Sequence, residues 1–125
     1  MSDPDNAAEL GPGLMLAAAT VELTHEPLPP DQVVSGNPTT GVLVLDQRDG
    51  HEIGVWEITP GTASDFEEDE VFVVLSGRAR VEFTAVVVGE VPPPIELGPG
   101  SVVRLVTGMH TTWTVHETLR KVYLA

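Results

Sequence analysis

Short runs of alternating apolar and polar residues, separated by turns rich in glycine and proline, occupy the chain from residue 41 to its C-terminus. A period of two places successive side chains on opposite faces of a β-strand. No segment shows the period of a long amphipathic helix. The pattern therefore predicts an all-β domain of about eight to ten short strands. The expected strands include 71–75, 78–88, 95–97, 101–106, 111–115 and 119–124, with turns at 76–77, 89–94 and 98–100.

The strongest local signal is the pair Asp49-Gly50, which stands between two runs of β-branched and aromatic residues. This dipeptide favours the tight turn of a β-hairpin, because both positions readily adopt the left-handed backbone conformation. In the second strand of the hairpin, Trp56 and Ile58 fall on one face and Val55 falls on the other. Both faces carry apolar groups, so we expect this strand to be covered on both sides.

The N-terminal third of the chain lacks this alternating pattern. Residues 1–13 are polar and acidic, with interrupting glycine and proline, and we expect a loose arm there. Residues 14–23 mix helix-favouring and strand-favouring types, which leaves a short helix and an edge strand as alternatives. The prolines and glycines of residues 24–41 exclude a long regular element. We predict a single barrel domain over residues 14–125.

The composition and net charge of the chain exclude several classes of protein function. A chain of 125 residues suits one domain, and the absence of cysteine excludes disulfides, thiolate metal sites and cysteine nucleophiles. The net charge of -13 opposes binding to nucleic acid and to anionic lipids. No apolar run approaches the roughly 20 residues of a membrane span, and the first residues lack the order of a signal peptide. We expect a soluble cytoplasmic protein without nucleic-acid or membrane partners.

An acidic loop precedes the most apolar strand. Its five carboxylates repel one another unless water, a cation or a partner screens them. Glu70, the last of them, either is solvated or paired with an arginine at the strand end, or lies inside a barrel mouth. In the second case burial would raise its pKa and suit it to acid–base chemistry. The five residues are Asp65, Glu67, Glu68, Asp69 and Glu70.

Four further side chains are candidates, each with two interpretations. His110 is either an exposed loop histidine or a base or imidazole ligand at the rim of a site. Arg104 is either a surface residue or an inward cation that binds a carboxylate ligand. Trp56 and Trp113 are either core residues or the apolar wall of a ligand pocket.

These motifs together resemble a known family. The stretches 54–61, 70–78, 98–101 and 108–123 resemble the conserved motifs of the cupins, and the last of them, with Trp113, is the most specific. The similarity covers about residues 41–125 and is closest to short single-domain cupins related to ureidoglycine aminohydrolase and to the ethanolamine-utilisation cupin. It implies a double-stranded β-helix, or jelly-roll, barrel that forms a homodimer.

The resemblance also implies a metal site that this sequence does not match. Metal-binding cupins supply two histidines shortly before the glutamate and a third in the second motif. In this chain the first two positions fall within 63–66, where no histidine occurs, and Thr111 stands at the third, beside His110. We therefore expect no cofactor. A divalent metal, should one bind, would need Asp65, Glu70 and His110 to converge.

The sequence thus predicts a cupin barrel that binds a small polar metabolite in its mouth. The alternative is a metal-dependent or acid–base enzyme of the hydrolase, isomerase or oxygenase type that uses Glu70 with His110 and Asp65. A non-catalytic binding or assembly role, like that of the ethanolamine-utilisation relative, also fits the missing histidines. The candidate catalytic residues are Glu70 and His110, and the candidate ligand-binding residues are Trp113, Arg104, Trp56 and Thr111.

Overall fold

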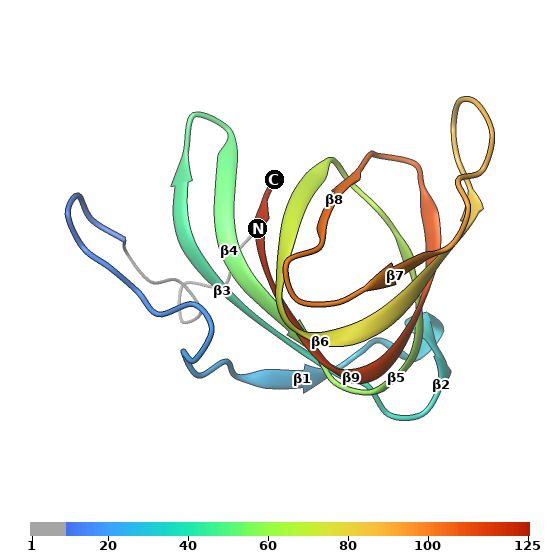
Figure 1. The fold of residues 1–125 in the computed structure, drawn as a ribbon, viewed down its shortest axis with the longest axis horizontal. Helices are drawn as coiled ribbons and strands as arrows, with labels where there is room; N and C mark the ends of the chain where they lie inside the picture. The colour runs from blue at the N-terminus through green and yellow to red at the C-terminus, as the bar shows by residue number, and fades with distance from the viewer. Residues whose placement is uncertain (1–9) are drawn as a thin grey trace.

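The computed structural model describes residues 10–125 of the chain, and these form an almost entirely β structure. One sheet curls on itself into a half-barrel (Figure 1). The predicted all-β class and the expected number of strands are confirmed. Within the described residues the elements are β1 (His25–Pro27), the 3-10 helix η2 (Pro30–Gln32), β2 (Val33–Ser35), β3 (Thr39–Arg48), β4 (His51–Ile58), β5 (Gly61–Phe66), β6 (Glu70–Ala85), β7 (Ile95–Leu97), β8 (Val102–Leu105) and β9 (His110–Leu124).

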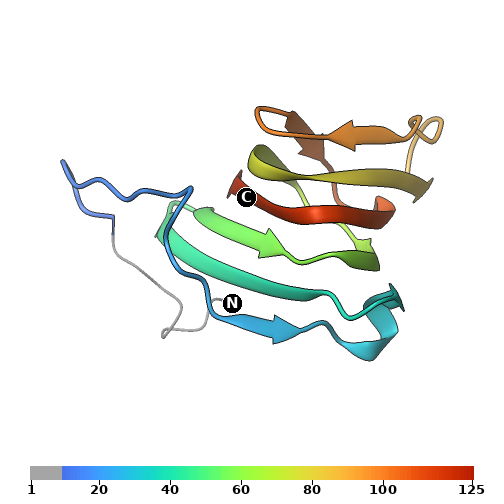
Figure 2. The same ribbon diagram turned by 60° about the horizontal axis from the view of Figure 1, so that its bottom comes forward.

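Two long antiparallel strands, β6 and β9, form the centre of the sheet and pair along most of their length. On its other side, β9 pairs with β5 through its first half and with β4 through its second half. β6 likewise pairs with β8 near its start and with β7 farther along. Figure 2 shows the resulting order from β7 and β8 through β6, β9, β4 and β3 to β1. Each strand of the central pair therefore has two further strands along its outer edge: β8 and β7 along β6, and β5 and β4 along β9.

The predicted turn at Ser76-Gly77 is wrong. β6 runs through this point as one bent strand, and its register against β9 shifts between Val74 and Ala79. Such bulges bend a strand without ending its pairing. Gly77, at a φ of 90°, allows the bend. The predicted break between residues 115 and 119 is wrong for the same reason, because β9 bends opposite this bulge and continues.

The apolar core lies inside the curl of the sheet. Phe72, Val81 and Leu119 have no exposed surface, and Trp113 is 4% exposed. Burying a side chain of this size stabilises the fold by about 1.5–3 kcal/mol relative to leaving it in water. This packing fixes the strands around the core. The same strands position the side chains that lie nearer the open end of the curl.

The predicted hairpin is confirmed. Asp49 and Gly50 have φ values of 52° and 77°, as a two-residue turn with both central residues left-handed requires. The predicted faces of β4 are confirmed as well. Trp56 and Ile58 point into the hollow of the sheet, while Val55 is fully buried on the other side.

Residues 14–23 form neither the helix nor the edge strand that the sequence left open. The segment has turns but no regular element, and its backbone is held by a side chain from far along the chain. One terminal nitrogen of Arg120 donates hydrogen bonds to the carbonyl oxygens of Ala18 and Val21, at 3.0 and 2.6 Å. The loose arm predicted for residues 1–13 lies mostly outside the described residues, whose first member, Leu10, donates a backbone hydrogen bond to Leu45.

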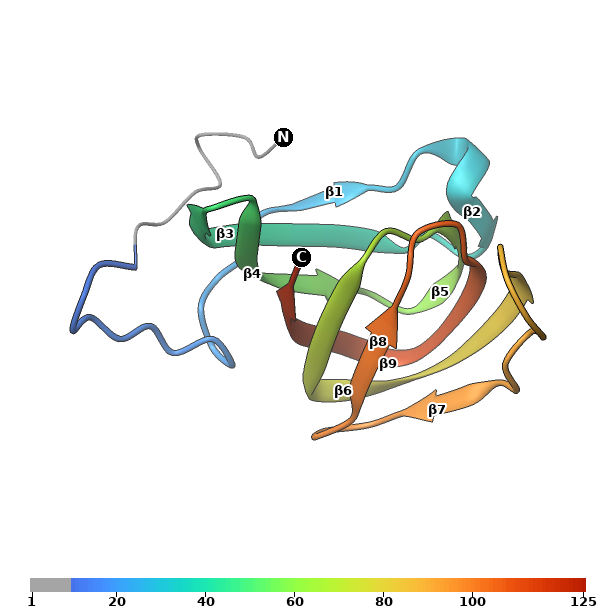
Figure 3. The same cartoon turned by 90° about the horizontal axis from the view of Figure 1, so that it is seen from above.

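The segment from β1 through η2 to β2 first pairs with β3, on the side away from β4, and then turns toward β5 (Figure 3). Its regular elements are only three residues long, as the prolines predict. No helix among the described residues is long and apolar enough to cross a membrane.

Beneath this segment lies a partly buried network centred on Glu57. Its carboxylate accepts a hydrogen bond from His25 at 2.7 Å and is paired with Arg120 at 3.3 Å. Burial by itself would raise the pKa of Glu57, but the hydrogen bonds and charges of His25 and Arg120 outweigh it and lower the pKa below the ordinary value of 4.5. The network joins β1, β4 and β9 on the outer face of the sheet.

Glu57→Gln is expected to lower the free energy of unfolding at neutral pH by about 1 kcal/mol. Because the pKa of Glu57 is lowered in the folded state, its carboxylate stabilises the fold above pH 4.5. This contribution is lost as the pH falls through the folded-state pKa. The difference between wild type and variant should therefore shrink on acidification. Urea denaturation over a pH series checks this, and a difference that grows toward low pH would contradict it.

Candidate functional site

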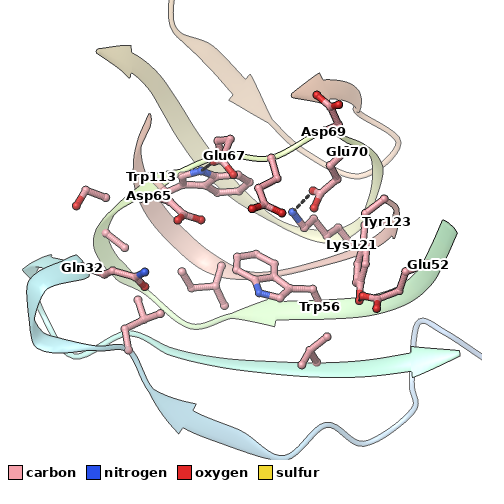
Figure 4. A pocket seen from close by; sticks show the side chains of 17 residues that line it. Gln32, Glu52, Trp56, Asp65, Glu67, Asp69, Glu70, Trp113, Lys121 and Tyr123 are labelled. Atoms are coloured by element: carbon pink, nitrogen blue, oxygen red, sulfur yellow. Dashed lines mark hydrogen bonds and ion pairs between the residues drawn. The ribbon is translucent and has the colours of Figure 1, made fainter. Parts of the chain in front are cut away.

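A cavity of about 330 Å³ opens at the mouth of the half-barrel and will be called the mouth pocket. Its walls come from β4, β5 and β9, and the loop between β5 and β6 forms its rim. Leu28 and Gln32, from the proline-rich segment, close one side. Figure 4 shows Asp65 and Glu70 directed toward this space from the rim, Asp69 directed away from it, and the two tryptophans on its walls.

Lys121 lies at the floor of the mouth pocket, with 6% of its surface exposed. Its ammonium nitrogen is 2.5 Å from a carboxylate oxygen of Glu70, the pair joined by a dashed line in Figure 4. The same nitrogen lies 4.2, 4.5 and 5.4 Å from the ring centroids of Phe72, Trp56 and Trp113. Three aromatic rings and one carboxylate therefore surround a buried cation.

Glu67 is positioned by two buried donors on β9. One of its carboxylate oxygens accepts hydrogen bonds from the Thr111 hydroxyl at 2.7 Å and from the Trp113 indole nitrogen at 3.2 Å. Thr111 is fully buried and Trp113 nearly so. A rim residue is thus fixed to the core, which orients its carboxylate at the pocket wall.

Asp65, on the wall of the mouth pocket, has a perturbed pKa. Its side chain stays open to solvent at the mouth, but partial burial of the carboxyl group raises its pKa from 3.8 to about 6. The neighbouring charge of Glu67 adds to the rise, while the backbone N–H of Phe66 and the charge of Lys121 oppose it. Asp65 is therefore suited to exchange protons near neutral pH.

The carboxyl carbon of Asp65 is expected to titrate with a midpoint near 6, which NMR of ¹³C-labelled protein can measure. A raised folded-state pKa favours the fold below 3.8, and this contribution is lost as pH rises through about 6. Asp65→Asn should therefore gain stability relative to wild type over that interval. A midpoint at the ordinary value would contradict this prediction.

At the opposite end of the mouth pocket, the Tyr123 hydroxyl donates a hydrogen bond to Glu52 at 2.6 Å. Burial, followed by the hydrogen bond and charge of Glu52, raises the pKa of Tyr123 well above its ordinary value. Tyr123 therefore remains protonated at neutral pH and presents a polar oxygen beside the floor.

The structure brings together five of the seven residues singled out from the sequence. Two are placed elsewhere. His110 stacks against Phe66 outside the mouth pocket, with ring centroids 4.3 Å apart and ring planes 9° apart. Arg104 is exposed on β8, at a separate, mostly apolar hollow of about 480 Å³. The five in or beside the mouth pocket are Trp56, Asp65, Glu70, Thr111 and Trp113.

The sequence analysis assigned no role at the site to Lys121 or Tyr123 and did not single out Glu67 from the acidic loop. A signal existed, because the inward face of β9 keeps its period of two from Thr111 through Trp113 to Lys121 and Tyr123. The predicted break in this strand hid it. A lysine near a chain end is also ordinarily solvated, so its burial depends on a strand that lies far away in the sequence.

The residues present do not fit the metal site that the resemblance implies. Within residues 10–125, no three His, Cys, Asp or Glu side chains are arranged to hold a metal ion. The carboxylate of Glu70 is bound to the Lys121 ammonium, and Thr111 at the third ligand position donates to Glu67. His110, Asp65 and Glu70 do not converge, which a transition metal would require.

Solved structures share this architecture at low sequence identity. A protein of unknown function from Pseudomonas syringae pv. tomato superposes with a TM-score of 0.69 at 24% identity over 85% of this chain, which spans 45% of that protein. The EutQ protein of Clostridium difficile gives 0.63 at 16% identity, covering 88% of this chain and 83% of that one. A putative ethanolamine utilization protein Q from Salmonella typhimurium gives 0.57 at 15%, covering 85% and 96%.

These identities establish the fold and leave the activity open. A comparison with curated proteins found no match. The similarity to ureidoglycine aminohydrolase stays a prediction. The family model of the EutQ-like cupin domain, however, matches residues 45–123, which include β4, β5, β6, nearly all of β9 and most of the mouth pocket. This chain is a cupin and belongs to the EutQ-like cupin domain family.

Proposed function

We propose that this cupin binds a small polar metabolite in the mouth pocket. The observation that carries the proposal is the joint placement of two indole walls and several oriented polar groups around one cavity. Ligand sites typically combine apolar walls with a few fixed polar groups that set orientation. A cavity of about 330 Å³ is at the small end of such sites, which supports a metabolite-sized ligand.

The groups around the cavity are fixed before any ligand enters. Glu67 is held by Thr111 and Trp113, and Glu70 is held by Lys121. Preorganised groups lose little conformational freedom on binding, so even a small ligand can bind measurably.

The two tryptophans of the chain both line this pocket, so intrinsic fluorescence reports ligand entry directly. We expect a screen of small polar metabolites to yield compounds that change the emission saturably. Trp56→Phe and Trp113→Phe, each with one remaining indole, identify the wall that the ligand contacts. Compounds that act equally in both variants and in free tryptophan would be quenchers. A diverse screen that yields only quenchers would contradict the proposal.

A second candidate, acid–base catalysis on the bound metabolite, is favoured by Asp65. Its pKa of about 6, at the rim of the cavity, suits proton transfer near neutral pH, whereas the Glu70 carboxylate is engaged in an ion pair with Lys121. Ligands from the screen should then be converted slowly when incubated with the protein, as followed by ¹H NMR. Asp65→Asn should stop the conversion but retain binding. Ligands that stay intact would leave a binding role alone.

A further inference from the structure

We propose that the ligand of the mouth pocket carries a positively charged nitrogen, as a small organic ammonium does. This inference rests on the proposed function and specifies its ligand class. It depends on three features of the described residues: aromatic walls that already bind an ammonium, carboxylates without a basic partner, and an arrangement unsuited to a metal ion.

The walls of the pocket bind an ammonium group in the structure itself. The Lys121 nitrogen lies 4.5 Å from the ring centroid of Trp56 and 5.4 Å from that of Trp113. The faces of electron-rich rings attract cations, and more strongly where water is excluded. Both indoles also border the open part of the cavity. A ligand that enters there meets the same two side chains that accommodate the lysine.

The carboxylates of the rim leave an excess of negative charge. Lys121 and Glu70 form a pair of zero net charge. Among the described residues, no lysine, arginine or histidine forms a salt bridge with Asp65, Glu67 or Asp69. Burial is the main cause of the raised pKa of Asp65, and the nearby charge of Glu67 raises it further. A cation between Asp65 and Glu67 would relieve their repulsion, whereas an anion would increase it.

The same geometry disfavours a bare metal ion. No three acidic or imidazole side chains in the described part of the chain are arranged to hold one. Spread carboxylates beside aromatic faces suit a larger cation, whose charge is distributed and whose carbon atoms contact the rings.

The test compares three probes of equal length that differ in charge: n-butylammonium, 1-butanol and butyrate. Tryptophan fluorescence is titrated at neutral pH and constant ionic strength. We expect n-butylammonium to bind at least about tenfold more tightly than 1-butanol, which corresponds to one charge-assisted interaction. Butyrate should not bind. Bound n-butylammonium should also lower the pKa of Asp65, as read by ¹³C NMR.

Variants place the binding at the proposed groups. Asp65→Asn and Glu67→Gln should each weaken n-butylammonium binding by about tenfold, because each removes one charge beside the ligand. Glu117→Gln changes the net charge equally on an exposed residue of β9 that does not line the mouth pocket, and should have no effect. Equal weakening in all three variants would overturn the inference, because binding would then follow only the overall charge.

The outcomes separate this inference from the proposed function. If 1-butanol or butyrate binds in the pocket as tightly as n-butylammonium, the pocket binds small molecules but the charge preference is wrong. If Mg²⁺ or Mn²⁺ displaces n-butylammonium at lower concentration than the amine itself requires, the site is a metal site and the inference fails. If none of the probes binds and the metabolite screen also fails, both proposals are wrong.

Discussion

Gly77→Ala is expected to lower the free energy of unfolding by about 4 kcal/mol, a large part of the stability of an ordinary domain. Gly77 has a φ of 90°, which L-residues with a side chain rarely adopt. A methyl group there would also overlap the carbonyl oxygen of Thr118 and lie 2.5 Å from the Cα of Leu119. Both obstacles are backbone atoms of β9, so a rotamer change cannot relieve them.

Gly50→Ala separates the two causes. Gly50 also has a positive φ, of 77°, but an added methyl group meets no atom within 4 Å. This variant should lose only about 1 kcal/mol of unfolding free energy, the cost of placing an alanine at a positive φ. Urea denaturation of both variants gives the comparison. Equal losses of unfolding free energy in the two variants would contradict the prediction, because the steric overlap between β6 and β9 at position 77 would then add nothing to the cost of the positive φ.

The second large effect is expected at Lys121. Lys121→Met keeps an unbranched apolar chain among the aromatic rings but leaves the Glu70 carboxylate without its cation. The expected loss is about 2 kcal/mol, less than the roughly 3–5 kcal/mol for a fully buried pair, because a carboxylate at the mouth can still be hydrated. Glu70 retains 20% side-chain exposure.

A double-mutant cycle tests this pair directly. Glu70→Gln alone leaves the buried ammonium unmatched, whereas the double variant Glu70→Gln/Lys121→Met leaves neither charge. The double variant should therefore be more stable than the sum of the single losses predicts, by about 1–2 kcal/mol. Strictly additive losses would show that the two side chains do not interact in solution.

Much of the architecture could be predicted because it depends on local patterns. The Asp49-Gly50 turn and the two faces of β4 follow from residue types within a few positions of each other. The alternation along β9 also separates an inward Thr111 from an outward His110. These are properties of single strands, which a period of two describes well.

What could not be predicted depends on contacts distant in sequence. Glu70 and Lys121 are 51 residues apart, and Arg120 holds Ala18 across 102 residues. The glycine at position 77 suggested a turn, because a strand bulge and a turn use the same residue types. The fold decides between them, since β9 pairs with β6 on both sides of the bend. The homodimer and the cytoplasmic location stay predictions.

The central claim, that a small polar ligand binds in the mouth pocket, is tested most directly by mapping the site with ¹H–¹⁵N NMR. A ligand from the fluorescence screen is titrated into ¹⁵N-labelled protein. We predict that the largest shifts fall on the indole N–H of Trp113, which donates to Glu67, and on the amides of residues 63–70. Shifts confined to the apolar hollow near Phe83, Ile95 and Met109 would contradict the claim.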